Sequence, residues 1–98
     1  MSIAVVVPAF GAAATVTRVV RDVVSAVPAA AVVVGDDGSR DRTADRAREA
    51  GARVLAHDRN RGKGSALRTG ILDALDAGAG IIATLDADGQ HDASSLPR

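Results

Sequence analysis

Short apolar runs alternate along the chain with segments of helical spacing, and this alternation restricts the possible folds more than any other feature. The four runs are Ile3–Val7, Ala31–Gly35, Arg53–Ala56 and Gly80–Leu85. The first, second and fourth are almost continuously apolar, which is typical of strands that are covered on both faces. Strands of this kind favour a parallel sheet with helices on its two faces.

The segments between the runs have the period of amphipathic helices. Every valine of Thr15–Val27 falls on one helical stripe, and Pro28 then ends this helix. Further helices are predicted over Arg42–Ala50 and Lys63–Ala77. The resulting order β-α-β-α-β-α-β, with short connections and right-handed crossovers, predicts a parallel α/β sheet.

The fourth run is followed by only a short polar stretch, and the chain ends where the next helix is expected to begin. We therefore expect residues 1–98 to form a single, partial domain, the N-terminal part of a longer fold. A partial sheet has an exposed edge, and burial is marginal at this size, so we also expect poor solitary stability or self-association.

The composition excludes several classes of function. The 98 residues include 12 basic and 12 acidic side chains, a balance that argues against general affinity for nucleic acid. The single aromatic residue offers no stacking platform for single strands, and the absence of cysteine excludes disulfides and thiolate chemistry. No apolar run has the ~18 residues of a membrane span, and the N-terminus lacks a basic signal-peptide region.

Polar side chains gather where each apolar run ends. The four polar segments are residues 8–11, 36–41, 57–64 and 86–92. The turns at the opposite ends of the runs consist of alanine and glycine and carry no polar side chains. Ligands of open α/β sheets bind at the carboxyl ends of the strands. This asymmetry therefore predicts a ligand site at that edge of the sheet.

Asp86 and Asp88 are separated by one residue directly after the fourth run, so both carboxylates can reach one hard cation. Oxygen ligands suit Mg²⁺ or Mn²⁺, and Gln90 continues the alternation with an amide oxygen. The alternative is ordinary turn chemistry, in which Asp and Gly are common. The acids at the ends of the neighbouring runs favour the metal site.

Asp36 and Asp37 lie at the tip of the second run, where a carboxylate can accept a hydrogen bond from a nucleobase N–H or a ribose hydroxyl. The same segment also suits a strand–turn–helix junction, with Ser39 or Asp41 as the helix N-cap. Both interpretations can hold together, with Ser39 and Asp41 as caps and the two aspartates facing a ligand.

Arg61 and Lys63 alternate with glycines at the start of the third helix, an arrangement that can receive a phosphate group. A solvated basic loop is the alternative. The stretch has neither the spacing of a P-loop nor a G-x-G-x-x-G fingerprint, so P-loop ATPase chemistry and dinucleotide binding are not supported. His57 and His91 are weaker candidates for a ligand or a base.

Four stretches together resemble the N-terminal half of the family-2 glycosyltransferases, most closely the branch of polyprenyl- and dolichol-phosphate mannose and glucose synthases. They are Val5–Phe10, Val32–Asp41, Asn60–Gly70 and Leu85–Asp92. Each motif alone is weak, but all four occur in order and cover nearly the whole chain. The resemblance implies a Rossmann-like domain of the GT-A type.

The resemblance also implies an activity, the metal-dependent, inverting transfer of a hexose from a nucleoside-diphosphate sugar (UDP or GDP) to a polyprenyl phosphate or another hydroxyl-bearing acceptor. It implies Mg²⁺ or Mn²⁺ as cofactor, a role in cell-wall or glycolipid biosynthesis, and a place in the cytoplasm or at the inner face of the membrane. The acceptor site and the catalytic base belong to the second half of that fold, so we expect this chain alone to be inactive. A truncated, non-catalytic nucleotide-binding module is the alternative.

By the same resemblance, the nucleotide-binding residues are Pro8, Ala9, Asp36, Asp37, Arg61, Lys63 and Asp86, and the metal ligands are Asp86, Asp88 and Gln90. Asp36, with Asp37 beside it, is the acid that contacts the base. Two departures stand out. Phe10-Gly11-Ala12 replaces the usual Tyr-Asn-Glu, which predicts weaker nucleotide binding, and Gly35 replaces a valine or isoleucine, which predicts thinner packing of the second strand.

Overall fold

The computed structural model describes residues 2–87, which form seven elements in the predicted order. They are β1 (Ile3–Ala9), α1 (Val16–Ala26), β2 (Ala30–Asp36), α2 (Thr43–Glu49), β3 (Arg53–Ala56), α3 (Lys63–Asp76) and β4 (Ile81–Thr84). The strands lie on the apolar runs, and the helices lie on the periodic segments between them. β1 continues beyond its apolar run, so Pro8 and Ala9 still belong to the sheet.

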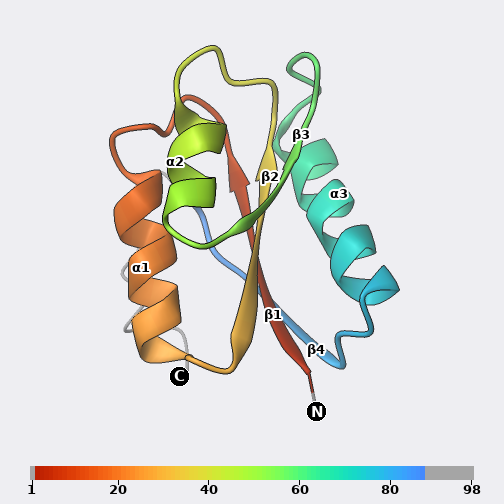
Figure 1. The fold of residues 1–98 in the computed structure, drawn as a ribbon. Helices are drawn as coiled ribbons and strands as arrows, with labels where there is room; N and C mark the ends of the chain where they lie inside the picture. Colours follow the sequence, from red (N-terminus) through yellow and green to blue (C-terminus); the bar gives the residue numbers. More distant parts are fainter. Residues whose placement is uncertain (1, 88–98) are drawn as a thin grey trace.

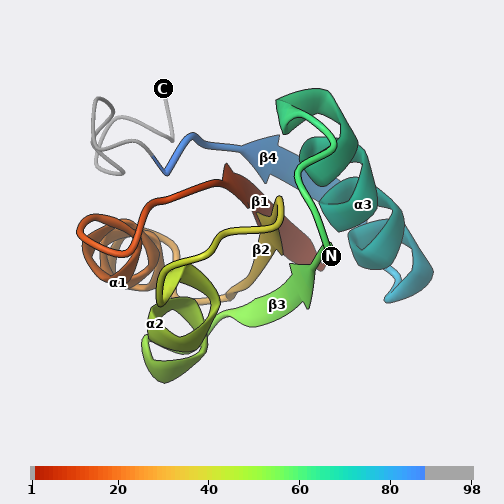
Figure 2. The ribbon, with the colours of Figure 1, turned by 90° about the horizontal axis from the view of Figure 1, so that it is seen from above.

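All the strand pairs are parallel, in the order β3-β2-β1-β4. α1 and α2 cover one face of the sheet, and α3 covers the other (Figures 1 and 2). The chain therefore moves outward from β1 to β3 and then returns through α3 to the opposite side of β1. The predicted parallel α/β fold is confirmed, and this reversal creates a topological switch point at β1.

Valine and alanine build the core on both faces of the sheet. The cluster under α1 and α2 includes Val5, Val7, Val16, Val20 and Val34. The smaller cluster under α3 contains Ala4, Val6, Val33 and Ala74. Successive residues of β1 thus contact opposite clusters, as the alternation of a strand requires. Each fully buried valine contributes about 1.5–3 kcal/mol through burial of apolar surface.

Two glycines determine how closely α3 approaches the sheet. A Cβ atom added to Gly35 of β2 would lie 2.4 Å from the carbonyl oxygen of Ala66, and one added to Gly70 would lie 2.4 Å from Cγ1 of Val6. Neither position has room for a side chain. The thinner packing expected at Gly35 is therefore wrong, because the backbone of α3 fills the space that a valine or isoleucine would need.

β3 and β4 form the two edges of the sheet that residues 2–87 build. The expected self-association through a sheet edge stays a prediction. Among the helices in these same residues, none combines the length and the apolar character needed to cross a membrane.

Candidate functional site

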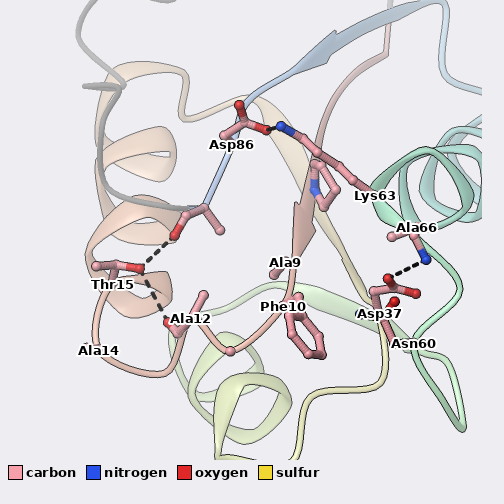
Figure 3. Close-up of a pocket in the computed structure, with 14 residues that line it drawn as sticks. Ala9, Phe10, Ala12, Ala14, Thr15, Asp37, Asn60, Lys63, Ala66 and Asp86 are labelled. Atoms are coloured by element: carbon pink, nitrogen blue, oxygen red, sulfur yellow. Dashed lines mark hydrogen bonds and ion pairs between the residues drawn. The ribbon is translucent and has the colours of Figure 1, made fainter.

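A cavity of about 540 Å³ lies at the carboxyl ends of β1 and β4, at the switch point of the sheet (Figure 3). Of the residues expected to bind a nucleotide, five line this cavity, namely Pro8, Ala9, Asp37, Lys63 and Asp86. Asp36 and Arg61 are not among the described residues that line it. The fold therefore brings residues from all four of the predicted polar segments together around one cavity.

Asp37 is the buried acid of the cavity, and its carboxylate accepts three hydrogen bonds from the protein. Oδ1 accepts one from the backbone N–H of Arg61 at 2.8 Å and one from Nδ1 of His57 at 2.9 Å. Oδ2 accepts one from the backbone N–H of Gly62 at 2.8 Å. Burial raises the pKa of Asp37, but the hydrogen bonds from Arg61, His57 and Gly62 outweigh burial, so the pKa is lowered overall.

The carboxylate of Asp36 closes the turn that follows β2, and its predicted contact with the nucleotide stays a prediction. Its Oδ1 accepts hydrogen bonds from the backbone N–H of Ser39 at 3.2 Å and from the Ser39 hydroxyl. The Ser39 oxygen in turn accepts from the backbone N–H of Gly11 at 2.9 Å. Asp36 and Ser39 therefore tie the loop after β2 to the loop after β1.

Asp41 makes a second tie of the same kind. It accepts a hydrogen bond from the backbone N–H of Thr43 at 3.0 Å and another from the backbone N–H of Ala13 at 3.3 Å. The hydrogen bond from the Thr43 hydroxyl is the main cause that lowers the pKa of Asp41. The expected N-cap was wrong, because α2 begins at Thr43 and Arg42 is its N-cap residue. Ser39 and Asp41 instead hold neighbouring loops together.

The two predicted phosphate-binding cations lie in different places. Lys63, the first residue of α3, reaches the cavity and forms an ion pair with Asp86 at 2.5 Å (Figure 3). The guanidinium group of Arg61 instead pairs with Asp58 at 3.1 Å on the surface. Arg61 contributes to the site through its backbone N–H, which binds Asp37.

Asp86 is the one member of the predicted metal set that lies within the described residues. Its side chain lines the cavity and is 28% exposed, so the carboxylate is accessible to a cation. Asp88 and Gln90, like His91, lie outside the described residues, and the metal set stays a prediction. Within residues 2–87, no group of three or more His, Cys, Asp or Glu side chains could hold a metal ion.

Two residues of the site, Thr15 and Asn60, were not predicted, and the hydrogen-bond partners of a third, His57, were not predicted either. The Thr15 hydroxyl donates a hydrogen bond to the carbonyl oxygen of Ala87 at 2.6 Å and so fastens the segment after β4 to α1 (Figure 3). Asn60 lines the cavity, and its position next to Arg61 and Lys63 in the basic loop could have indicated this. His57 bridges Asp37 and Thr69, a pairing between distant residues that no spacing reveals.

The family model described as "Glycosyl transferase family 2" matches residues 4–98. The protein RfbJ of Shigella flexneri is 34% identical over 96 residues, which is 98% of this chain and 71% of that protein. An undecaprenyl-phosphate mannosyltransferase of Micrococcus luteus is 29% identical over 103 residues, which is 100% of this chain and 42% of that protein. The chain spans 25% to 71% of the length of the curated relatives that it matches.

Solved structures have the same fold. Glucosyl-3-phosphoglycerate synthase of Mycobacterium tuberculosis, crystallised with Mn²⁺, UDP and glucosyl-3-phosphoglycerate, superimposes with a TM-score of 0.69 at 31% identity. The match covers 88% of this chain and 33% of the synthase. Because the family model matches almost the whole chain and the fold agrees, this chain belongs to glycosyl transferase family 2.

Proposed function

We propose that the cavity binds the nucleoside diphosphate of a sugar donor and that the whole protein transfers a hexose from this donor. The proposal depends on one observation: a single cavity contains both the buried carboxylate of Asp37 and the ion pair of Lys63 and Asp86. An ionised carboxylate accepts hydrogen bonds, which suits a nucleobase N–H or a ribose hydroxyl. An ammonium group suits the oxygens of a diphosphate.

The relatives support this proposal without deciding the substrate. The synthase of M. tuberculosis was crystallised with UDP, and the relative in M. luteus is named for undecaprenyl phosphate. The donor proposed here is therefore a UDP- or GDP-hexose, and the acceptor is a polyprenyl phosphate. Such an acceptor places the reaction at a membrane surface, and we propose the inner face.

We also propose that Asp86, Asp88 and Gln90 hold a divalent cation, Mg²⁺ or Mn²⁺. Asp86 fits this role, because it offers an accessible carboxylate oxygen inside the cavity. When bound, the cation would offset the negative charge that develops on the leaving diphosphate. Lys63 lies beside the same carboxylate and can add its own charge to that stabilisation.

In the proposed transfer, an acceptor oxygen attacks the anomeric carbon from the side opposite the diphosphate. The bond between that carbon and the diphosphate oxygen breaks, the diphosphate leaves with the electron pair, and the configuration inverts. A lipid phosphate is largely ionised at neutral pH and needs no base, whereas a hydroxyl acceptor must lose a proton to one. We assign no such base among residues 2–87.

The test is a set of four calorimetric titrations of UDP, for the parent and for Asp88→Asn, each with Mn²⁺ and with a chelator. If UDP and Mn²⁺ bind at adjoining positions, each raises the affinity for the other by the same factor, so Mn²⁺ should raise the affinity of the parent for UDP. Asp88→Asn should remove most of this gain and leave the metal-free affinity nearly unchanged. Equal affinities in all four titrations would defeat the metal site. If the parent binds neither UDP nor, in a repeat of the same titrations, GDP, the proposed function is defeated.

A second measurement separates the enzyme from a non-catalytic nucleotide-binding module. The full-length protein is incubated with UDP- or GDP-hexose, Mn²⁺ and a polyprenyl phosphate. Release of nucleoside diphosphate above the level without acceptor supports the transferase. Tight nucleotide binding with no release for either donor supports the module.

A further inference from the structure

We propose that His57 is a positioning residue, which holds the carboxylate of Asp37 in place by linking it to Thr69 on α3. The proposal rests on the proposed function, because Asp37 matters to a ligand only if the cavity binds one. His57 is the first residue after β3, and its side chain is only 9% exposed, while that of Asp37 is 3% exposed. The residues that follow, from Asp58 to Arg61, are exposed.

The two hydrogen bonds of the imidazole ring determine which nitrogen carries the proton. Nδ1 lies 2.9 Å from Oδ1 of Asp37, and an ionised carboxylate can only accept, so Nδ1 is the donor. In the neutral ring, Nε2 is then an acceptor, and the Thr69 hydroxyl donates to it at 2.8 Å. In this form of the ring, the proton is on Nδ1, and His57 bridges the residue after β2 to α3.

The hydrogen bond from His57 limits how many acceptor positions of the Asp37 carboxylate are left for a ligand. A carboxylate has about four acceptor positions. His57 and the Arg61 N–H use two of these on Oδ1, and the Gly62 N–H uses one on Oδ2. One position on Oδ2 stays available. Removal of the His57 ring would free a second position, on Oδ1, and would leave the carboxylate held only by the backbone N–H groups of Arg61 and Gly62.

The backbone around His57 is held in place without the imidazole ring. The backbone N–H of His57 donates to the carbonyl oxygen of Asp36 at 2.8 Å, which holds the end of β3 to β2 without the side chain. The backbone N–H of Asp37 likewise donates to the carbonyl oxygen of Ala9 at 2.8 Å. Substitution of His57 should therefore alter the direction of a carboxylate more than the arrangement of the strands.

Three substitutions separate the two hydrogen bonds. His57→Phe keeps a ring of similar shape and removes both bonds. His57→Asn places an amide nitrogen near the position of Nδ1, so it keeps the donor to Asp37 and loses the acceptor for Thr69. Thr69→Val keeps the shape of the threonine and removes only its hydroxyl. Each variant is first compared with the parent by circular dichroism and thermal unfolding.

The affinities for UDP and for inorganic pyrophosphate, both measured with Mn²⁺, then test the proposal. Loss of a hydrogen bond to a charged group predicts that His57→Phe weakens UDP binding roughly tenfold. We expect pyrophosphate binding to stay within about twofold, His57→Asn to recover most of the UDP affinity, and Thr69→Val to lie between. A purely structural role of His57 predicts equal losses for UDP and pyrophosphate. Such equal losses, or unchanged UDP binding in His57→Phe, would overturn the proposal.

A nitrogen NMR measurement on the parent needs no ligand. Where the ring is neutral, it should show a protonated Nδ1 and an unprotonated Nε2 for His57. The amide signals of Arg61 and Gly62 should shift in His57→Phe and return toward the parent in His57→Asn. The opposite tautomer, or unmoved amide signals, would contradict the positioning role. If the parent binds no UDP, the proposed function fails, and these signals still decide whether His57 orients Asp37.

Discussion

The ammonium group of Lys63 lies 2.5 Å from a carboxylate oxygen of Asp86, and this contact joins the first residue of α3 to the segment after β4. Lys63 begins the helix that carries the chain from β3 past β1 to β4, and Asp86 lies beyond the carboxyl end of β4. The contact therefore lies across the switch point of the sheet, where the cavity lies.

Lys63 and a divalent cation should compete for the same carboxylate. Lys63→Met removes the competing charge, so we expect Mn²⁺ to bind about two- to fivefold more tightly in the absence of nucleotide, since an exposed ion pair is worth ~1 kcal/mol or less. UDP should bind more weakly to the same variant when a chelator is present, because an ammonium group that can pair with phosphate is missing. Calorimetry measures both affinities, and Arg61→Met is the control, because Arg61 pairs with Asp58 instead. A change of the same size in the control would contradict this account of Lys63.

Asp37 and Asp36 should respond differently to the same substitution. Asp37→Asn places a poorer acceptor against three N–H donors inside the cavity, so we expect a loss of about 2–3 kcal/mol in the free energy of unfolding and most of the UDP affinity. Asp36→Asn also lowers stability, because Asp36 is buried and accepts from Ser39, but it should leave UDP binding nearly intact. Urea unfolding and calorimetry measure the two effects. Equal loss of UDP binding in both variants would mean that the effect comes from the shared turn.

The lowered pKa of Asp37 predicts how stability depends on pH. Its folded-state pKa lies below the usual value of 3.8, so the ionised carboxylate stabilises the fold above that value. This stabilisation should be lost as the pH falls through the lower, folded-state pKa. Urea unfolding of the parent and of Asp37→Asn between pH 2 and pH 6 (a window of roughly two pH units on each side of that value) should show a difference in stability that narrows toward acid. A difference that stays constant would show that Asp37 is not the group responsible.

The close approach of α3 to β2 predicts opposite effects for two glycine substitutions. Gly35→Ala puts a Cβ atom 2.4 Å from the carbonyl oxygen of Ala66, so we expect the free energy of unfolding to fall by about 1–3 kcal/mol. Gly64→Ala adds a methyl group in α3 where no atom lies within 4 Å, so we expect a gain of about 0.5–1 kcal/mol from helix propensity. Thermal and urea unfolding compare the two. Tolerance of alanine at Gly35 would mean that α3 can move away from the sheet.

The element order could be predicted from the sequence, because strands and helices differ in the period of their apolar residues. The strand order could not, because it depends on the face of the sheet to which α3 returns, and the buried positions of α3 are the small residues Ala66, Gly70 and Ala74. The close approach of the Ala66 backbone to Gly35 also could not be predicted from the residues around Gly35. A missing side chain in a strand can mean loose packing or a close helix, and only the structure distinguishes them.

The sequence predicted which strand ends form the candidate site, but it did not predict what each residue at those ends does. Asp36 follows the alternation of Val32 and Val34, so its side chain belongs to the face of α1 and α2, while its neighbour Asp37 lines the cavity. The sequence pointed to both acids and placed Asp36 first. The proposed roles of Asp88 and Gln90 lie outside the described residues and stay predictions.

The ties between the loops have a consequence for how this cavity can change over evolution. Ser39, Thr43 and Asp41 all hold the loop after β1 by its backbone, through the N–H groups of residues 11, 12 and 13. Every amino acid except proline supplies that N–H group, so the rim keeps its shape whichever side chains it carries. Side-chain substitutions in this loop, including the Phe10-Gly11-Ala12 stretch, can therefore change which ligands the cavity accepts, while the backbone conformation of the loop stays the same.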